Sequence, residues 1–167
     1  SERTNSARSL WWNGQCSISL GCGADMAIYA IARRTTNVTS GQSAHTIYTT
    51  TTDRGVLLEA GLFMGAATAS TYSLGRPAAA GITPTSPVLL LAEDPASPAA
   101  TINSALAWST SPTNPTNDLR RWASPATLGT GVIFTFPRGL LIAVSTNFVL
   151  QNLATNGVVD SYFVVDE

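Results

Sequence analysis

Histidine is the side chain most often used to move protons near neutral pH, and this chain of 167 residues has one, His45. A serine–histidine–carboxylate arrangement would have to use it. Its neighbours Ser43, Thr46 and Asp53 supply no nucleophile motif such as Gly-x-Ser-x-Gly. His45 also begins an alternating segment rich in β-branched residues. We therefore interpret it as an ordinary half-buried strand residue and predict that the protein is not an enzyme.

The ten acidic residues are scattered and offer few pairs for acid–base chemistry. Glu59 lies inside an apolar run, where an ion pair with an arginine, such as Arg54 or Arg76, is the ordinary solution. Glu93 lies in a proline-flanked segment. A competing hypothesis is a glycan hydrolase with Glu59 or Glu93 as its acid. We favour the structural role for both residues.

Metal and cofactor sites are not expected. One histidine and two cysteines give at most three soft ligands, and His45 is remote in sequence from Cys16 and Cys22. Residues 114–118 carry side-chain oxygens but lack the calcium-loop pattern. The glycine-containing tripeptides are too short for a nucleotide-binding fingerprint. We interpret the cysteines as reduced thiols, with a disulfide closing a small loop as the alternative.

The four tryptophans are the best candidates for binding a partner. Trp11 and Trp12 are adjacent in a polar N-terminal segment, where an exposed aromatic pair is costly unless it docks. Either this segment folds back onto its own core or it anchors a neighbouring subunit. Trp108 and Trp122 flank a proline-rich segment and could form a sugar-stacking platform. For that second pair, capping one end of the fold is the favoured reading.

The charge content is low. Charged residues make up 11% of the chain, against about 25% in ordinary domains, and all nine basic residues are arginine. A largely neutral surface is easily buried against other subunits. The net charge of −1 argues against nucleic-acid binding, which needs a basic footprint. Arg33-Arg34 and Arg120-Arg121 are isolated pairs, which we interpret as interface or solvated pairs.

Neither a membrane partner nor secretion is expected. No apolar run approaches the roughly 20 residues that cross a bilayer. Residues 1–6 are polar and lack the apolar core of a signal peptide, as in a cytoplasmic protein whose initiator methionine has been removed. Asn37-Val38-Thr39 matches the N-glycosylation pattern, which we attribute to chance without a secretory route.

Threonine, valine and isoleucine are frequent, and glycine and proline recur at short intervals, as is typical of β structure. We expect strands over residues 26–32, 45–52, 56–64, 88–92, 131–136, 140–144, 148–152 and 158–165. The remainder of 66–98 is expected to be irregular. Residues 101–108 suit a short strand or one helical turn, and 117–122 a single helical turn. Asn156-Gly157 between two apolar runs predicts a hairpin.

About eight short strands, with no repeat at a fixed period, predict an all-β fold. We expect a single jelly-roll-like antiparallel β-sandwich over residues 25–167, preceded by an extended N-terminal arm over 1–24. A chain of this length can bury a sizeable core without disulfides or metals.

Several segments resemble small β-sandwich proteins encoded among the particle genes of tailed bacteriophages. They are Leu74–Val88 (LGRPAAAGITPTSPV), Glu93–Pro95 (EDP), Gly131–Leu140 (GVIFTFPRGL) and Val164–Glu167 (VVDE). The resemblance extends over residues 26–167, and the arm with Trp11 and Trp12 departs from it.

The resemblance implies a virion component, assembled in the host cytoplasm: a capsid decoration or minor capsid protein, or a piece of a head or tail fibre. The expected partners are the major capsid protein or other virion proteins. The resemblance also implies a homo-oligomer, with a trimer favoured. The alternative is a fibre or tail module that recognises host glycans, with Trp108 and Trp122 as its platform. The interface residues expected are Trp11, Trp12, Arg33, Arg34, Arg120 and Arg121.

Overall fold

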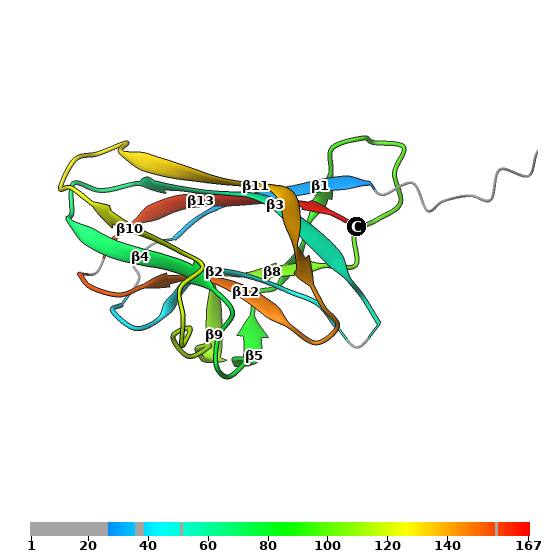
Figure 1. The fold of residues 1–167 in the computed structure, drawn as a ribbon, viewed down its shortest axis with the longest axis horizontal. Coiled ribbons are helices and arrows are strands. Elements are labelled where there is room, and N and C mark those ends of the chain that lie inside the picture. The colour runs from blue at the N-terminus through cyan, green and yellow to red at the C-terminus, as the bar shows by residue number, and fades with distance from the viewer. Residues whose placement is uncertain (1–26, 36–38, 51, 156) are drawn as a thin grey trace, which may run out of the picture.

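A computed structural model describes residues 27–35, 39–50, 52–155 and 157–167. Every regular element in these ranges is a β-strand. The strands are β1 (Ile28–Arg34), β2 (Ser43–Tyr48), β3 (Gly55–Met64), β4 (Ser70–Gly75), β5 (Ile82–Thr85), β6 (Val88–Leu89), β7 (Leu91–Ala92), β8 (Asn103–Ala105), β9 (Ala107–Thr110), β10 (Arg120–Ser124), β11 (Gly131–Ile142), β12 (Asn147–Asn152) and β13 (Val159–Asp166). Two antiparallel sheets pack face to face (Figure 1).

The strand order is that of a jelly roll. The five-stranded sheet has the order β11-β3-β13-β1-β7, and the six-stranded sheet has the order β10-β4-β12-β2-β8-β6. Setting aside β5 to β9, the first strand pairs with the last, the second with the second-last, and so on inward to β4 and β10. This nested pairing, which alternates between two sheets, defines the jelly roll. The predicted all-β, jelly-roll-like sandwich is confirmed.

Residues 76–119 form an insertion between β4 and β10. β7 adds to the five-stranded sheet beside β1, and β8 and β6 add to the six-stranded sheet beside β2. β5 and β9 pair with each other and lie beyond the six-stranded sheet, on the side away from the five-stranded one (Figure 1). The insertion therefore adds a third layer over one sheet only.

The expected strand over 88–92 is divided between the two sheets. β6 pairs with β8 in the six-stranded sheet, whereas β7 pairs with β1 in the five-stranded sheet. Leu90 separates them and is only 3% exposed, since its side chain belongs to the core. The backbone N–H of Leu90 donates to the carbonyl oxygen of Ile102 at 3.2 Å. One leucine thus marks where the chain crosses from one layer to the other.

Other local predictions were wrong. Residues 131–142 form one strand, where two separate strands were expected. A register shift between Thr135 and Leu140 marks a bulge in this strand and leaves Pro137, which has no N–H, outside the hydrogen-bonded ladder. β10 replaces the predicted helical turn, and β4 lies in the segment expected to be irregular. Two short strands, β8 and β9, replace the strand or turn expected over 101–108. The Asn156-Gly157 hairpin is also wrong, because β12 and β13 belong to different sheets.

His45 lies in the centre of the sandwich. It is fully buried rather than half-buried, and its ring lies 4.7 Å from that of Phe163. Its Nδ1 is 2.9 Å from the Ser161 hydroxyl of β13, and its Nε2 is 2.9 Å from the Ser104 hydroxyl of β8. The imidazole therefore links the two sheets. Burial, reinforced by the positive charge of Arg33, lowers the pKa of His45 to about 3.

We predict that His45 makes the fold sensitive to mild acid. In the unfolded chain the imidazole has a pKa near 6.5 and takes up a proton, whereas the buried ring stays neutral until about pH 3. The free energy of unfolding therefore falls below about pH 6.5, by about 1.4 kcal/mol per pH unit. Between pH 7 and pH 5 we expect urea unfolding to report a loss of roughly 2 kcal/mol from this residue.

His45→Asn is the matched control, because an amide can still form hydrogen bonds but does not titrate in this range. The variant should be less stable than the wild type at pH 7, yet lose much less stability on going to pH 5. Equal losses in the two proteins would show that the stability change does not come from His45.

Candidate interaction surface

The outer faces of the two sheets differ in how they are covered. The insertion packs on the outer face of the six-stranded sheet, where Ala44 and Thr46 are completely buried. There the Ser43 backbone N–H donates to the Ser111 hydroxyl at 3.0 Å, and Pro115 packs against Gly75. No described segment lies over the outer face of the five-stranded sheet (Figure 1).

We call this uncovered surface the bare face. It consists of the outward-pointing residues of the five-stranded sheet, which alternate with buried core residues along each strand. They are Ile28, Ala30, Ala32 and Arg34 on β1, Val56, Glu59, Gly61 and Phe63 on β3, Leu91 on β7, Gly131, Ile133, Thr135 and Leu141 on β11, and Asp160, Tyr162, Val164 and Asp166 on β13.

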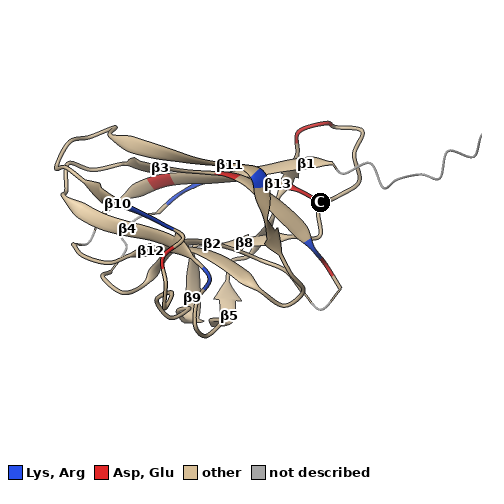
Figure 2. Ribbon diagram, viewed as in Figure 1, with Lys and Arg blue, Asp and Glu red and all other residues tan. Residues whose placement is uncertain are grey.

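The bare face is mostly apolar. Leu91 is 67% exposed and Ile133 is 51% exposed. Charged residues are few on the ribbon as a whole (Figure 2). At one end of the bare face, Arg34 and Asp160 form an ion pair with Nε and Oδ1 3.2 Å apart. Glu59 lies between this ion pair and Asp166 at the other end, and most of the remaining residues of the face are apolar. Apolar sheet surface of this kind is often buried against a partner.

A hollow of about 250 Å³ opens at the Arg34 end of the bare face. We call it the Phe63 pocket. It is lined by Ala32, Arg33, Arg34, Phe63, Asp160, Ser161 and Tyr162. The rings of Phe63 and Tyr162 are stacked, with centroids 6.4 Å apart and planes within 15°. An aromatic wall beside an ion pair can accept a flat apolar side chain that carries one polar group.

Glu59 lies near the middle of the bare face and accepts a hydrogen bond from the Tyr162 hydroxyl. The expected pairing with Arg54 or Arg76 is therefore wrong. Arg76 instead donates to the Leu141 carbonyl oxygen at 2.9 Å. Burial, together with the hydrogen bond and negative charge of Glu59, raises the pKa of Tyr162 to about 12. Burial and Glu59 together therefore extend the pH range over which this tyrosine stays neutral.

Glycine is required beneath the Tyr162 ring. A Cβ atom added at Gly61 would lie 1.9 Å from Cε1 of Tyr162. The absence of a side chain at Gly61 therefore lets the ring lie flat on β3 beside Phe63.

The two arginine pairs lie in different sheets. Arg33 and Arg34 end β1, whereas Arg120 and Arg121 begin β10. The Arg120 guanidinium lies 5.2 Å from the ring centroid of Phe136, and Arg121 Nη1 lies 3.5 Å from Asp118 Oδ2. Of the four, only Arg34 lies on the bare face, because Arg33 points inward beside the core.

The two tryptophans of the described residues lie on opposite faces of the six-stranded sheet. The indole N–H of Trp108 donates to the Thr46 hydroxyl at 3.3 Å, and its ring contacts Tyr48 edge-on at 5.2 Å. Trp122 packs against the core, opposite Tyr72 of β4. The structure does not bring the two rings together as one sugar-stacking platform.

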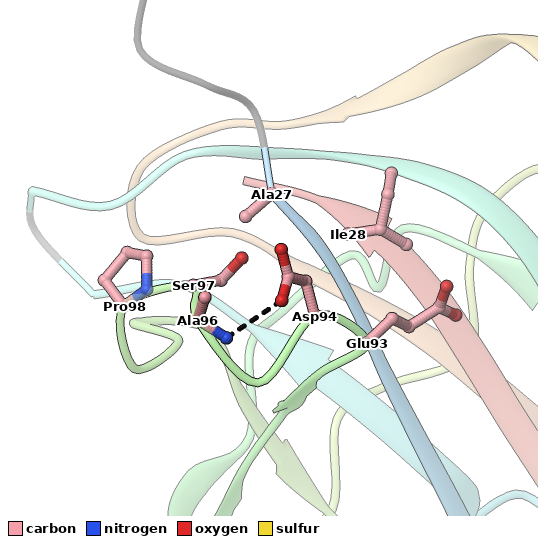
Figure 3. Close-up of a pocket in the computed structure, with 7 residues that line it drawn as sticks. All are labelled: Ala27, Ile28, Glu93, Asp94, Ala96, Ser97 and Pro98. Carbon is pink, nitrogen blue, oxygen red and sulfur yellow. Dashed lines mark hydrogen bonds between the residues drawn. The ribbon is translucent and has the colours of Figure 1, made fainter.

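A second hollow, of about 730 Å³, lies beside the start of β1 (Figure 3). Its described lining is Ala27, Ile28, Glu93, Asp94, Ala96, Ser97 and Pro98. The Asp94 carboxylate accepts the backbone N–H of Ala96 at 2.9 Å, so it fixes the loop. Glu93 lies in this loop, whereas Glu59, the other residue considered as a catalytic acid, lies on the bare face. The two carboxylates belong to different parts of the surface.

Among the described residues, no three His, Cys, Asp or Glu side chains are grouped as a metal site would require. The same part of the chain contains no helix long and apolar enough to cross a membrane. Trp11, Trp12, Cys16, Cys22 and the arm over 1–24 lie outside the described residues. Predictions that concern them are not tested by the structure.

Sequence analysis missed the bare face, although a signal for it exists. β1 is apolar at both alternating positions as far as Ala32: Tyr29 and Ile31 face the core, while Ile28 and Ala30 face outward. A sheet with one solvated face normally alternates apolar and polar residues. Strands that are apolar on both sides therefore indicate a sheet that is covered on both sides.

We predict that Glu59→Gln lowers the pKa of Tyr162 from about 12 toward its ordinary value near 10. The neutral amide no longer disfavours the phenolate, whereas burial, the larger cause, remains and keeps the pKa above 10. Phenolate absorbance during alkaline titration measures the shift, and Tyr162→Phe identifies which part of the signal belongs to this residue. Superimposable titrations of the wild type and Glu59→Gln would contradict the coupling.

Comparisons with protein-family models, with curated proteins and with solved structures found no match to this chain. What supports a function is therefore the geometry of the described residues and the composition of the chain.

Proposed function

We propose that the protein is a structural component of a tailed-bacteriophage virion, a capsid decoration or minor capsid protein that binds the major capsid protein. In this proposal it is assembled into the particle as a homo-oligomer and performs no catalysis. The bare face is the observation that carries the proposal.

The bare face supports assembly because exposing apolar side chains to water is unfavourable, and a partner that covers them removes this free-energy cost. Leu91 and Ile133 lie on opposite edge strands of the same sheet, so the apolar surface extends across its full width. Burying apolar area stabilises association by about 25 cal/mol per Å², before the entropy of association is subtracted. The ion pair and the Glu59–Tyr162 hydrogen bond pair four polar groups of this face with one another, whereas Asp166 Oδ1, at the other end, has no hydrogen-bond partner among the described residues.

The composition of the whole chain also supports assembly with other subunits. With 11% charged residues and no lysine, the surface has little to keep separate copies apart in solution. Jelly rolls recur in viral capsid proteins and also in lectins, so the fold alone does not choose between these functions. The resemblance of residues 26–167 to phage particle proteins supports a virion component, and the bare face favours one that is assembled into the shell.

The alternative, a glycan-binding module of a fibre or tail, has less support. It relied on Trp108 and Trp122 acting together, yet these rings lie on opposite faces of the six-stranded sheet. Trp108, on β9 of the insertion, is also engaged with Thr46 and Tyr48 of β2. Glycan binding that is lost in Trp108→Ala would revive the alternative.

We predict that Ile133→Asp weakens incorporation into particles, because a carboxylate buried in the apolar part of the contact has no partner. Ile82→Asp is the matched control: Ile82 is 61% exposed, but it lies on β5 in the insertion. Co-sedimentation of each variant with phage particles that lack the protein measures binding. We expect Ile133→Asp to bind at least about tenfold more weakly than the wild type, and Ile82→Asp to bind normally.

Equal binding by both variants would exclude the bare face as the contact. A wild-type protein that stays monomeric and binds no particle would remove the proposed function altogether.

A further inference from the structure

We propose that the Phe63 pocket, at the Arg34 end of the bare face, binds residues 9–24 of a second copy of this chain, with Trp11 or Trp12 inside it. This inference rests on the proposed function, since it names how neighbouring subunits of the assembly are joined.

The composition of residues 9–24 matches the bare face. No charged residue occurs between Ser9 and Ala24, the longest such stretch before β1. The stretch includes the apolar side chains of Leu10, Trp11, Trp12, Ile18 and Leu20. A charged segment would leave unpaired charges on an apolar sheet, whereas this one would not.

The Phe63 pocket provides what an indole ring requires. The stacked rings of Phe63 and Tyr162 offer a flat apolar wall. The Arg34 guanidinium can lie over the face of an indole, and the Asp160 carboxylate can accept its N–H. Both charged side chains are about half exposed, at 61% and 48%, so they can adjust to a ligand.

The direction of the chain at the start of the fold favours a second copy over the same one. The backbone N–H of Ala27 donates to the carbonyl oxygen of Glu167 at 3.0 Å, and the N–H of Glu167 donates to the carbonyl oxygen of Ala27 at 3.1 Å. Ala27 therefore continues the line of β1. The Phe63 pocket lies at the opposite end of β1, beside Arg34, about 20 Å away. Traced toward the N-terminus, the chain at Ala27 is therefore directed away from its own pocket.

The connection is long enough to reach a neighbour. Trp12 lies fifteen residues before Ala27, and an extended chain of that length spans up to about 50 Å. Each copy carries one donor segment and one acceptor face, which is a head-to-tail arrangement. Such contacts close into a ring when the rotation between neighbours allows it. A closed ring would be a cyclic oligomer, such as the trimer that the resemblance implies.

Disulfide trapping tests the proposal in the full chain. In a Cys22→Ser background, Cys16 is the only thiol and lies four residues from Trp12. Ala32→Cys adds a second thiol at the rim of the Phe63 pocket. Ala123→Cys is the matched control, since it is also an exposed alanine in a strand but lies on β10 of the six-stranded sheet. Mild oxidation and non-reducing electrophoresis then report the products.

We expect Ala32→Cys to give covalent dimers and larger species at least about tenfold more efficiently than Ala123→Cys, because docking raises the local thiol concentration. Adding Trp11→Ser and Trp12→Ser should abolish the difference. An intramolecular disulfide between Cys16 and the thiol introduced at position 32, identified by mass spectrometry in a monomer band, would overturn the assignment to a second copy. Equal trapping of both variants would overturn docking on the bare face.

Particle binding separates this inference from the proposed function. If the Trp11→Ser, Trp12→Ser variant still co-sediments with particles and Ala32→Cys is not trapped, the inference fails and the proposed function stands. If the chain carrying Ala32→Cys is trapped but the wild type binds no particle, the contact between copies stands and the capsid function fails.

Discussion

The pairing of β1 with β13 is the constraint on which the rest of the fold depends. Seven residue pairs join these strands, from Ile28 opposite Asp166 to Arg34 opposite Asp160. The first and last strands of the jelly roll are neighbours, and the pairs β2 with β12, β3 with β11 and β4 with β10 nest inside them in turn. The same pairing places Ala27 and Glu167 together at one end of β1. It also determines which sheet holds β3 and β13, and hence the position of the Phe63 pocket.

The position of the insertion determines which sheet remains bare. The chain leaves β4 and returns at β10, and both strands belong to the six-stranded sheet. Residues 76–119 therefore start and finish on that layer, and they fold over its outer face. Only the short β7 crosses to the other sheet, at the buried Leu90. The uncovered face of the five-stranded sheet is thus a consequence of topology, and its apolar composition indicates that something else covers it.

The sequence allowed the fold class and the strongest strands to be predicted, because β3, β12 and β13 contain short apolar runs bounded by turn residues. β4 was missed since half of Ser70–Gly75 is hydroxyl-bearing, although Tyr72 and Leu74 face the core. β10 was missed because Asn117-Asp118 resembles a helix cap. Whether strands on either side of a turn belong to one sheet or two is decided by long-range pairing, which a local Asn-Gly signal does not encode.

The candidate surface was less predictable than the fold, for a related reason. A residue such as Ile133 is apolar whether it faces a core or a partner, so its type alone does not reveal its role. Once strand pairing shows which residues face the core, the residues that face outward can be identified. Polar residues show the converse, because a polar type does not guarantee exposure. His45 is polar yet lies in the core, where the hydroxyls of Ser104 and Ser161 form hydrogen bonds with both ring nitrogens. In this protein, sheet pairing rather than residue type decides which side chains are available for binding.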